Sequence, residues 1–338
     1  MAIDANAYSP KQFSFLIAEQ DDFGTLNPDS SGSPDNPWVA VDVDSIGSPS
    51  LNLNQVLEHR TGSRVLQATD FFQDKLAKVT EISVSGTATT EVLDILLGNM
   101  CGGTAPFGID SNKGSETFTT ATTNQTANQI LSICYSSPSS GNTLAFKDCF
   151  CTSITFNGDT GTEGGRVKFS ATFKTGSLPA DLTNTDIAID TAITANNYFM
   201  NAWTSDDRVV AGIAECLVNS FSTTIENDVV FAGATSTGYE MASRVGEISA
   251  TADFSIKYDA NTDVLFENFH DQASGASEGT TLMGLDTTPS DGSFEFKFTN
   301  SVITNVAFNE GDMMMLDVSV KAVGAGIGST DHLVDISC

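Results

Sequence analysis

Apolar and polar residues alternate with a period of two along much of the chain. Between Glu247 and Tyr258, every even position is apolar and every odd position is polar. Such alternation predicts a strand with one buried face and one wet face. Segments 167–173 and 316–322 alternate in the same way, and further strands are indicated by two sets of apolar residues: Phe294, Phe296 and Phe298, and Leu217, Phe221 and Ile225. We therefore expect a mainly β protein.

Helical periodicity is clear at only two places. The first is Glu91–Leu97, which we expect to end at Gly98, and the second is Asp263–His270. Each follows Thr, Asn or Asp residues that can cap a helix.

The order of these elements repeats along the chain. Val79–Ser83 and Val245–Ser249 are similar and each opens a strand that precedes one of the helices, whereas Ile154–Asn157 and Val306–Asn309 each precede a later strand. The copies are separated by about half of the chain, which is the signature of an internal repeat. We expect two tandem similar β-sandwich or barrel domains, each with one short flanking α-helix. The boundaries we predict are 1–176 for the first domain with an N-terminal arm, 177–211 for a linker region, 212–326 for the second domain and 327–338 for a C-terminal tail.

Charge narrows the possible partners. The 338 residues include 43 acidic and 15 basic side chains, which gives a formal net charge of −28. Such an acidic surface is not expected to bind nucleic acid phosphates or anionic membranes. No run is apolar enough to span a membrane, and Met1–Gln12 does not resemble a secretory signal. We expect the cysteines to be buried or free thiols of a protein made in a reducing cytoplasm: Cys101, Cys134, Cys149, Cys151, Cys216 and Cys338.

Two motifs resemble functional loops. Gly275–Gly279 fits the G-x-S-x-G pattern around a nucleophilic Ser277, but a helix precedes it where a buried strand is required. Asp259–Asp263 begins like a calcium loop, yet Val264 and His270 stand where that loop needs Gly and Glu. A turn with a helix cap is the better interpretation of the second motif.

The remaining candidates are weaker still. Asp42 and Asp44 lie two apart and suit either a shared cation or a solvated strand face, while Asp159–Gly165 is expected to be an exposed hairpin tip. Gly324–Gly328 has no following helix to make a dinucleotide site, and Met313–Met315 suits the core or a subunit contact. The histidines lack a catalytic pairing: His59, His270 and His332. We therefore expect no catalytic, cofactor or metal site, and no enzyme.

With these elements in place, the chain resembles the tail tube (major tail) proteins of long-tailed bacteriophages, in a duplicated form. The resemblance is one of element order and lies in these segments: Phe13–Glu19, Val79–Gly86, the helix at Glu91, Cys216–Asn227, Gly246–Thr251, the helix at Asp263, the strand at Phe294 and Val302–Val306. It implies a homo-oligomer of trimeric rings stacked into a helical tube in the virion tail. It also implies tape-measure, terminator and distal tail proteins as partners.

The resemblance further implies that a wet strand face lines a channel through which genomic DNA passes without specific binding. A negative wall would keep the DNA from sticking. The candidate lumen positions share the polar phase of two strands: Glu81, Ser83, Ser85, Thr87, Glu247, Ser249, Thr251, Asp253 and Ser255. An outer solvent-facing surface explains the same alternation equally well.

Other assignments stay open. The alternatives are a baseplate or decoration protein of a virion, or a two-domain β-sandwich adhesin or carbohydrate-binding module. Only Trp38 and Trp203 offer indole platforms for a glycan.

Overall fold

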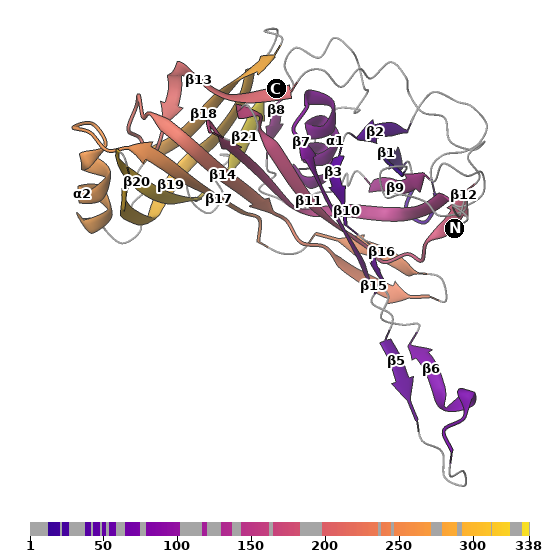
Figure 1. Cartoon of the computed structure of the whole chain (residues 1–338). Coiled ribbons are helices and arrows are strands. Elements are labelled where there is room, and N and C mark those ends of the chain that lie inside the picture. The colour runs from indigo at the N-terminus through magenta and orange to yellow at the C-terminus, as the bar shows by residue number, and fades with distance from the viewer. Residues whose placement is uncertain are drawn as a thin grey trace, which may run out of the picture.

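The protein is mainly β, as the alternation predicted, and its computed structural model has long antiparallel strands with two α-helices (Figure 1). The structure describes residues 13–20, 22–26, 38–41, 43–47, 49–51, 54–58, 65–74, 79–101, 117–119, 130–136, 143–161, 165–182, 198–235, 238–244, 247–271, 279–288, 293–311, 313–324 and 333–337.

The first half of the chain contributes twelve strands, a 3-10 helix and one α-helix. They are β1 (Ser14–Gln20), β2 (Val39–Val41), β3 (Val43–Ile46), β4 (Ser50–Leu51), β5 (Asn54–Leu57), η2 (Ala68–Asp70), β6 (Phe71–Asp74), β7 (Thr80–Thr87), α1 (Thr90–Cys101), β8 (Thr117–Thr119), β9 (Ile130–Ser136), β10 (Thr143–Asp159), β11 (Lys168–Thr175) and β12 (Ala180–Leu182).

The second half contributes nine strands and the other α-helix. They are β13 (Tyr198–Val209), β14 (Val218–Glu226), β15 (Val230–Ala234), β16 (Tyr239–Ser243), β17 (Ser249–Lys257), α2 (Asp263–Asp271), β18 (Gly279–Thr288), β19 (Ser293–Glu310), β20 (Met314–Ala322) and β21 (Val334–Ser337). The expected linker region thus includes β12 and β13, and the expected tail includes β21.

One antiparallel series of strands crosses both halves. In spatial order it runs β3, β7, β11, β10, β14, β17, β20 and β19. The pairing of β10 with β14 joins the first half to the second. The linked strands curl into a barrel-like arrangement, because the two longest strands, β10 and β19, each take part in a second group of pairings.

β10 and β19 have the same pattern of neighbours. On one side, β10 pairs with β11 and then β12, and β19 pairs with β20 and then β21. On the other side, the N-terminal part of each strand pairs with the strand that precedes it in the chain, β9 or β18. The register of both strands also shifts at matching places, between Cys151 and Ser153 in β10 and between Ile303 and Asn305 in β19.

This continuity corrects one expectation. The segments at 294–298 and 302–306 were expected to be separate strands, but β19 contains both. The intervening Thr299, Asn300 and Ser301 are compatible with extended structure, and a bulge absorbs the bend that a turn would otherwise provide.

Aromatic residues fill much of the core. Large side chains below 2% exposure include Phe15, Phe146, Phe156, Phe169 and Phe254. Each buried side chain of this kind contributes roughly 1.5–3 kcal/mol by leaving water. In β17 the even positions Ala250–Ile256 are buried, as the alternation predicted, whereas Leu217 precedes β14 and is exposed rather than continuing the face of Phe221 and Ile225.

Both predicted helices are confirmed, but the first does not end at Gly98. α1 continues to Cys101, because Asn99 and Met100 are buried against the sheet and this packing outweighs the weak helix propensity of glycine. The Thr89 hydroxyl accepts a hydrogen bond from the Val92 amide at 3.4 Å, which caps the N-terminus.

Buried thiols were also predicted, and the four cysteines whose side chains are described are buried: Cys134, Cys149, Cys151 and Cys216. Burial raises the pKa of Cys134 to about 12 and that of Cys216 to about 11. These thiols are therefore poor nucleophiles.

Candidate assembly surface

Eight of the nine predicted lumen positions lie on one face of the continuous sheet, and the ninth, Glu247, is exposed just before β17 begins. Because residues directly opposite each other in paired strands share a face, one row of side chains can be followed across five strands. It runs through Ser85, Ser170, Thr155, Thr224 and Thr251. Within β7 and β17 the other predicted positions share this phase, and Glu81, Ser83 and Asp253 are exposed.

Hydroxyl groups dominate this polar face and bond to one another across strands. Thr155 Oγ1 and Thr224 Oγ1 are 2.9 Å apart, which ties β10 to β14. Ser319 Oγ donates to Asp253 Oδ1 at 2.5 Å. A shallow hollow of about 240 Å³ opens on the same face and includes Ser222 in its lining.

The polar face carries charges of both signs, and the acidic residues are in excess once the carboxylates bonded to its lysines are included. On β7, β11, β14, β17, β20 and the second part of β10, five acidic residues face this side: Glu81, Asp159, Glu226, Asp253 and Asp317. Four basic residues join them: Lys168, Lys174, Lys257 and Lys321. Sequence reasoning missed the lysines because it did not identify which strands stand between β7 and β17.

Three of these lysines are in ion pairs, including Lys257 with Asp259. Lys168 Nζ lies 2.7 Å from Asp44 Oδ2, and Lys174 Nζ lies 2.8 Å from Asp228 Oδ1. The hydrogen bond from Lys174 is the main reason that the pKa of Asp228 lies below its usual value. Exposed pairs of this kind contribute at most about 1 kcal/mol.

Several strands are paired on one side only in the described part of the chain, and two of these edges bear on assembly. In β19, residues 302–310 pair with β20 on one side only, because β18 ends its pairing at Ser301. In the first half, residues 43–47 have β7 on one side only. The matching part of β10 is instead fully paired, because β14 occupies its second side over Ser153–Asp159.

The second half of the chain also closes the end of α1. Arg244 Nη2 donates to the Asn99 carbonyl oxygen at 3.0 Å, and Asn227 Nδ2 donates to the Met100 carbonyl oxygen at 2.8 Å. The same guanidinium bonds to the Asn227 carbonyl oxygen and lies over the Phe150 ring at 5.7 Å. The last carbonyl groups of α1 are thus satisfied by side chains from the other half.

α2 has no such cover in the described part of the chain, and lies at the outer end of the molecule beside β19 and β20 (Figure 1). Of its apolar side chains, only Leu265 is buried. We define the α2 patch as the exposed residues Phe266, Phe269, Phe308 and Met314. The rings of Phe266 and Phe308 are 5.3 Å apart, and Phe308 also contacts Tyr258. The methionine run was expected in the core or at a subunit contact; Met313 and Met314 are 57% and 43% exposed, so they do not lie in the core of the single chain.

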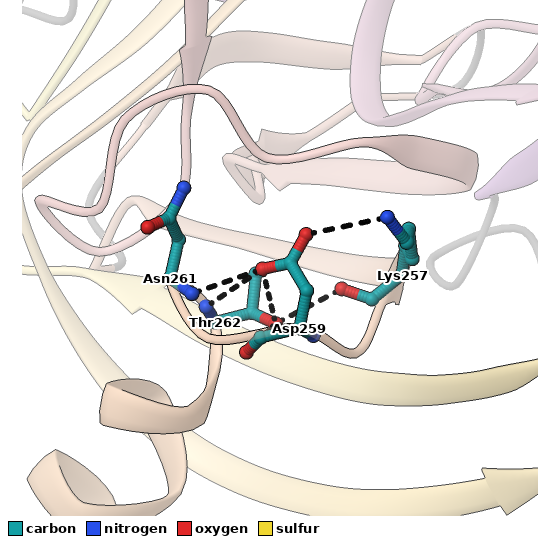
Figure 2. Close-up of polar contacts among 4 residues, drawn as sticks. All are labelled: Lys257, Asp259, Asn261 and Thr262. Carbon is teal, nitrogen blue, oxygen red and sulfur yellow. Dashed lines mark hydrogen bonds and ion pairs between the residues drawn. The ribbon is translucent and has the colours of Figure 1, made fainter.

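The calcium-like segment is a turn that leads into α2, as expected. Asp259 Oδ1 accepts hydrogen bonds from the amides of Asn261 at 3.0 Å and Thr262 at 3.3 Å, and Asp259 Oδ2 lies 3.6 Å from Lys257 Nζ (Figure 2). Partial burial raises the pKa of Asp259, but these amides and the lysine outweigh it and hold the pKa below its usual value.

The other candidate motifs contribute little. Asp44 is paired with Lys168, and Asp159 to Gly161 form an exposed turn that begins the predicted hairpin tip. His270 is exposed on α2. Among the described residues, no group of His, Cys, Asp or Glu is placed to hold a metal ion. Ser277, His59, His332, Asp42 and most of Gly324–Gly328 lie outside the described residues.

The indole of Trp38 is fully buried, so it offers no platform for a glycan; the side chain of Trp203 lies outside the described residues. Within the part of the chain that the structure describes, no helix has the length and apolarity to cross a membrane. In comparisons with known proteins, no family model and no curated protein matches this sequence.

Proposed function

We propose that this chain is a structural virion protein that assembles head to tail into rings, which stack to form the tail tube of a long-tailed bacteriophage. The observation that carries this proposal is the matching neighbour pattern of β10 and β19, together with the free edges at 43–47 and 302–310. Two tandem similar β domains would give this pattern.

Self-association follows from the physical chemistry of those edges. A free strand edge exposes backbone N–H and C=O groups that can pair with another chain. Because the two edges lie on different parts of the chain, contact between them is heterologous and can close into a ring. Three chains with two domains each would give a ring with pseudo-sixfold symmetry.

The polar face supports a role as the wall of the channel. Hydroxyl groups and an excess of acidic side chains offer no cationic surface that would retain DNA. The lumen would then have a negative lining. The Glu247→Lys and Asp253→Lys double variant is expected to slow DNA ejection while tubes still form; ejection at the normal rate would place this face on the outside.

A baseplate or decoration protein with a related fold remains the second candidate, since rings without tubes would also use the free edges. The adhesin or carbohydrate-binding alternative is weakened by the buried indole of Trp38.

Negative-stain electron microscopy of the purified full-length chain tests the proposal. Hollow tubes, or stacked rings with an open bore, are expected at high protein concentration. A population of single chains at all concentrations would reject it, and isolated rings that never stack would favour the baseplate or decoration role.

A further inference from the structure

The environment of two equivalent phenylalanines points to what covers the α2 patch. β10 and β19 each have a bulge at the matching place, which is followed by Ser153 in β10 and by Asn305 in β19. Phe156 and Phe308 each lie three residues beyond these positions and are therefore equivalent. Phe156 is 1% exposed, whereas Phe308 is 46% exposed. The difference accompanies the presence of β14 beside β10 and the absence, in the described residues, of any strand at the same place beside β19.

The first half of the chain contains a strand equivalent to β14. β14 pairs with β17, with Ile225 opposite Ala250, and β3 pairs with β7, with Ile46 opposite Val84. β7 and β17 are themselves equivalent through the repeated segments Val79–Ser83 and Val245–Ser249. The free edge of β3 would therefore pair with β19 in the way that β14 pairs with β10.

We propose that residues 43–47 of a second copy of this chain pair with residues 305–309 of β19 and cover the α2 patch. This interface rests on the proposed ring-forming function and repeats, between chains, the β10–β14 pairing that exists within one chain. Its register follows from that pairing. Ile154 lies opposite Ile225 and Thr155 opposite Thr224, so Val306 would lie opposite Ile46 and Ala307 opposite Ser45 of the next copy.

The partner is a second copy because the complementary edge is on the same chain and the joint continues the sheet already present. The α2 patch stands where α1 stands in the first half, and the end of α1 is covered by the segments that flank the β15–β16 hairpin. In the second copy, the β5–β6 hairpin would lie at the corresponding place. That hairpin projects away from the rest of its own chain (Figure 1).

A disulfide between Ser45→Cys and Ala307→Cys tests the register. Directly opposite residues have Cβ atoms about 4.5–5.5 Å apart, close to disulfide distance. The full-length chain would carry both changes together with Cys101→Ser and Cys338→Ser, since the four described native thiols are buried. After diamide oxidation, non-reducing electrophoresis should show a ladder of linked chains that ends at the closed ring. The matched control pairs Ser45→Cys with Glu310→Cys, three residues and about 10 Å further along the same edge, and should give little product.

A second variant tests the patch. Phe308→Asp is expected to lower the yield of the 45–307 disulfide at least about tenfold, because docking would bury its charge. Its circular dichroism should be unchanged, since the side chain is exposed in the single chain. Val230→Asp, at a side chain that is 52% exposed on β15, makes the same change away from both edges and should leave the yield unchanged.

The outcomes separate this inference from the function. Hollow tubes with no more 45–307 product than the control pair would overturn the inference and leave the tube function standing. Efficient, register-specific disulfide formation in particles without a bore would support the inference and reject the tube. Single chains with no disulfide would reject both.

Discussion

α1 and α2 begin with related sequences, Glu91-Val92-Leu93 and Asp263-Val264-Leu265, but their surroundings differ. α1 is packed into the core, and residues from the other half of the chain satisfy its last carbonyl groups. α2 leaves three apolar side chains exposed. The difference lies in the cover that each helix receives: the second half of the chain covers α1, and nothing in the described part of the chain covers α2. Under the proposed interface, this exposed apolar face would be covered by a second copy of the chain.

The largest expected effect on stability distinguishes the two equivalent phenylalanines, Phe156 and Phe308. Phe156→Ala should lower the free energy of unfolding by about 3–5 kcal/mol, because it removes a fully buried ring. Phe308→Ala should cost less than about 1 kcal/mol in the single chain, since its ring is already half exposed. Urea unfolding of dilute protein measures both. Equal losses would mean that Phe308 belongs to the core of its own chain.

Removing the link between the second half and α1 is expected to have the next largest effect. Arg244→Ala would leave the buried carbonyl oxygens of Asn99 and Asn227 without their guanidinium donor, at a cost of about 3 kcal/mol in the free energy of unfolding. Arg166→Ala, at an exposed arginine near the β10–β11 turn, is the control and should change stability by less than about 0.5 kcal/mol. If the two variants unfold at the same urea concentration, Arg244 does not fix the end of α1.

A third change tests how the β15–β16 hairpin seats on the first half. A Cβ atom added at Gly176 would lie 2.9 Å from a ring carbon of Phe231 and closer still to Tyr239. Gly176→Ala should therefore displace the hairpin and cost about 1–3 kcal/mol in unfolding free energy. Gly324→Ala meets no atom within 4 Å and serves as the matched control. Indistinguishable melting of the two variants would contradict the close packing.

The smallest effect concerns the turn before α2. The pKa of Asp259 is lowered in the folded state, so its carboxylate stabilises the fold at pH values above its unfolded pKa of about 4, and this contribution is lost as the pH falls through the folded pKa. Asp259→Ala should cost about half a kcal/mol or less at pH 7, because solvent screens an exposed group. The cost should shrink toward pH 3 when urea unfolding is repeated there. A cost that is constant with pH would assign it to the turn geometry instead.

The sequence was sufficient for the local elements, because alternation in β17 and the apolar spacing of α1 and α2 depend only on neighbouring residues. Pairings between distant segments were not accessible in this way. The contact of β10 with β14 brings Thr155 beside Thr224 across 69 residues, and no periodicity within either strand encodes it. For the same reason, Lys168 and Lys174 on the polar face were missed, although their own strand was predicted.

Local sequence patterns also did not predict how far α1 and β19 extend. Gly98 signals a helix end, and only the burial of Asn99 and Met100 against the sheet carries the helix further. The predicted phase of Glu81, Ser83, Thr251 and Asp253 was correct for a shared face, while its location inside or outside an assembly stays a prediction.

The pairing of β10 with β14 also bears on the kinetics of ring closure. In the proposed ring, each chain would complete the joint between its two halves as it folds, at the high effective concentration of a tethered partner. A closed ring built this way would have only as many joints between separate chains as it has chains, whereas single-domain subunits forming the same ring would need twice as many such joints. Because the two halves are covalently linked, half of the strand registers in the ring would be fixed before chains meet. Fewer pairings could then form in the wrong register at low protein concentration.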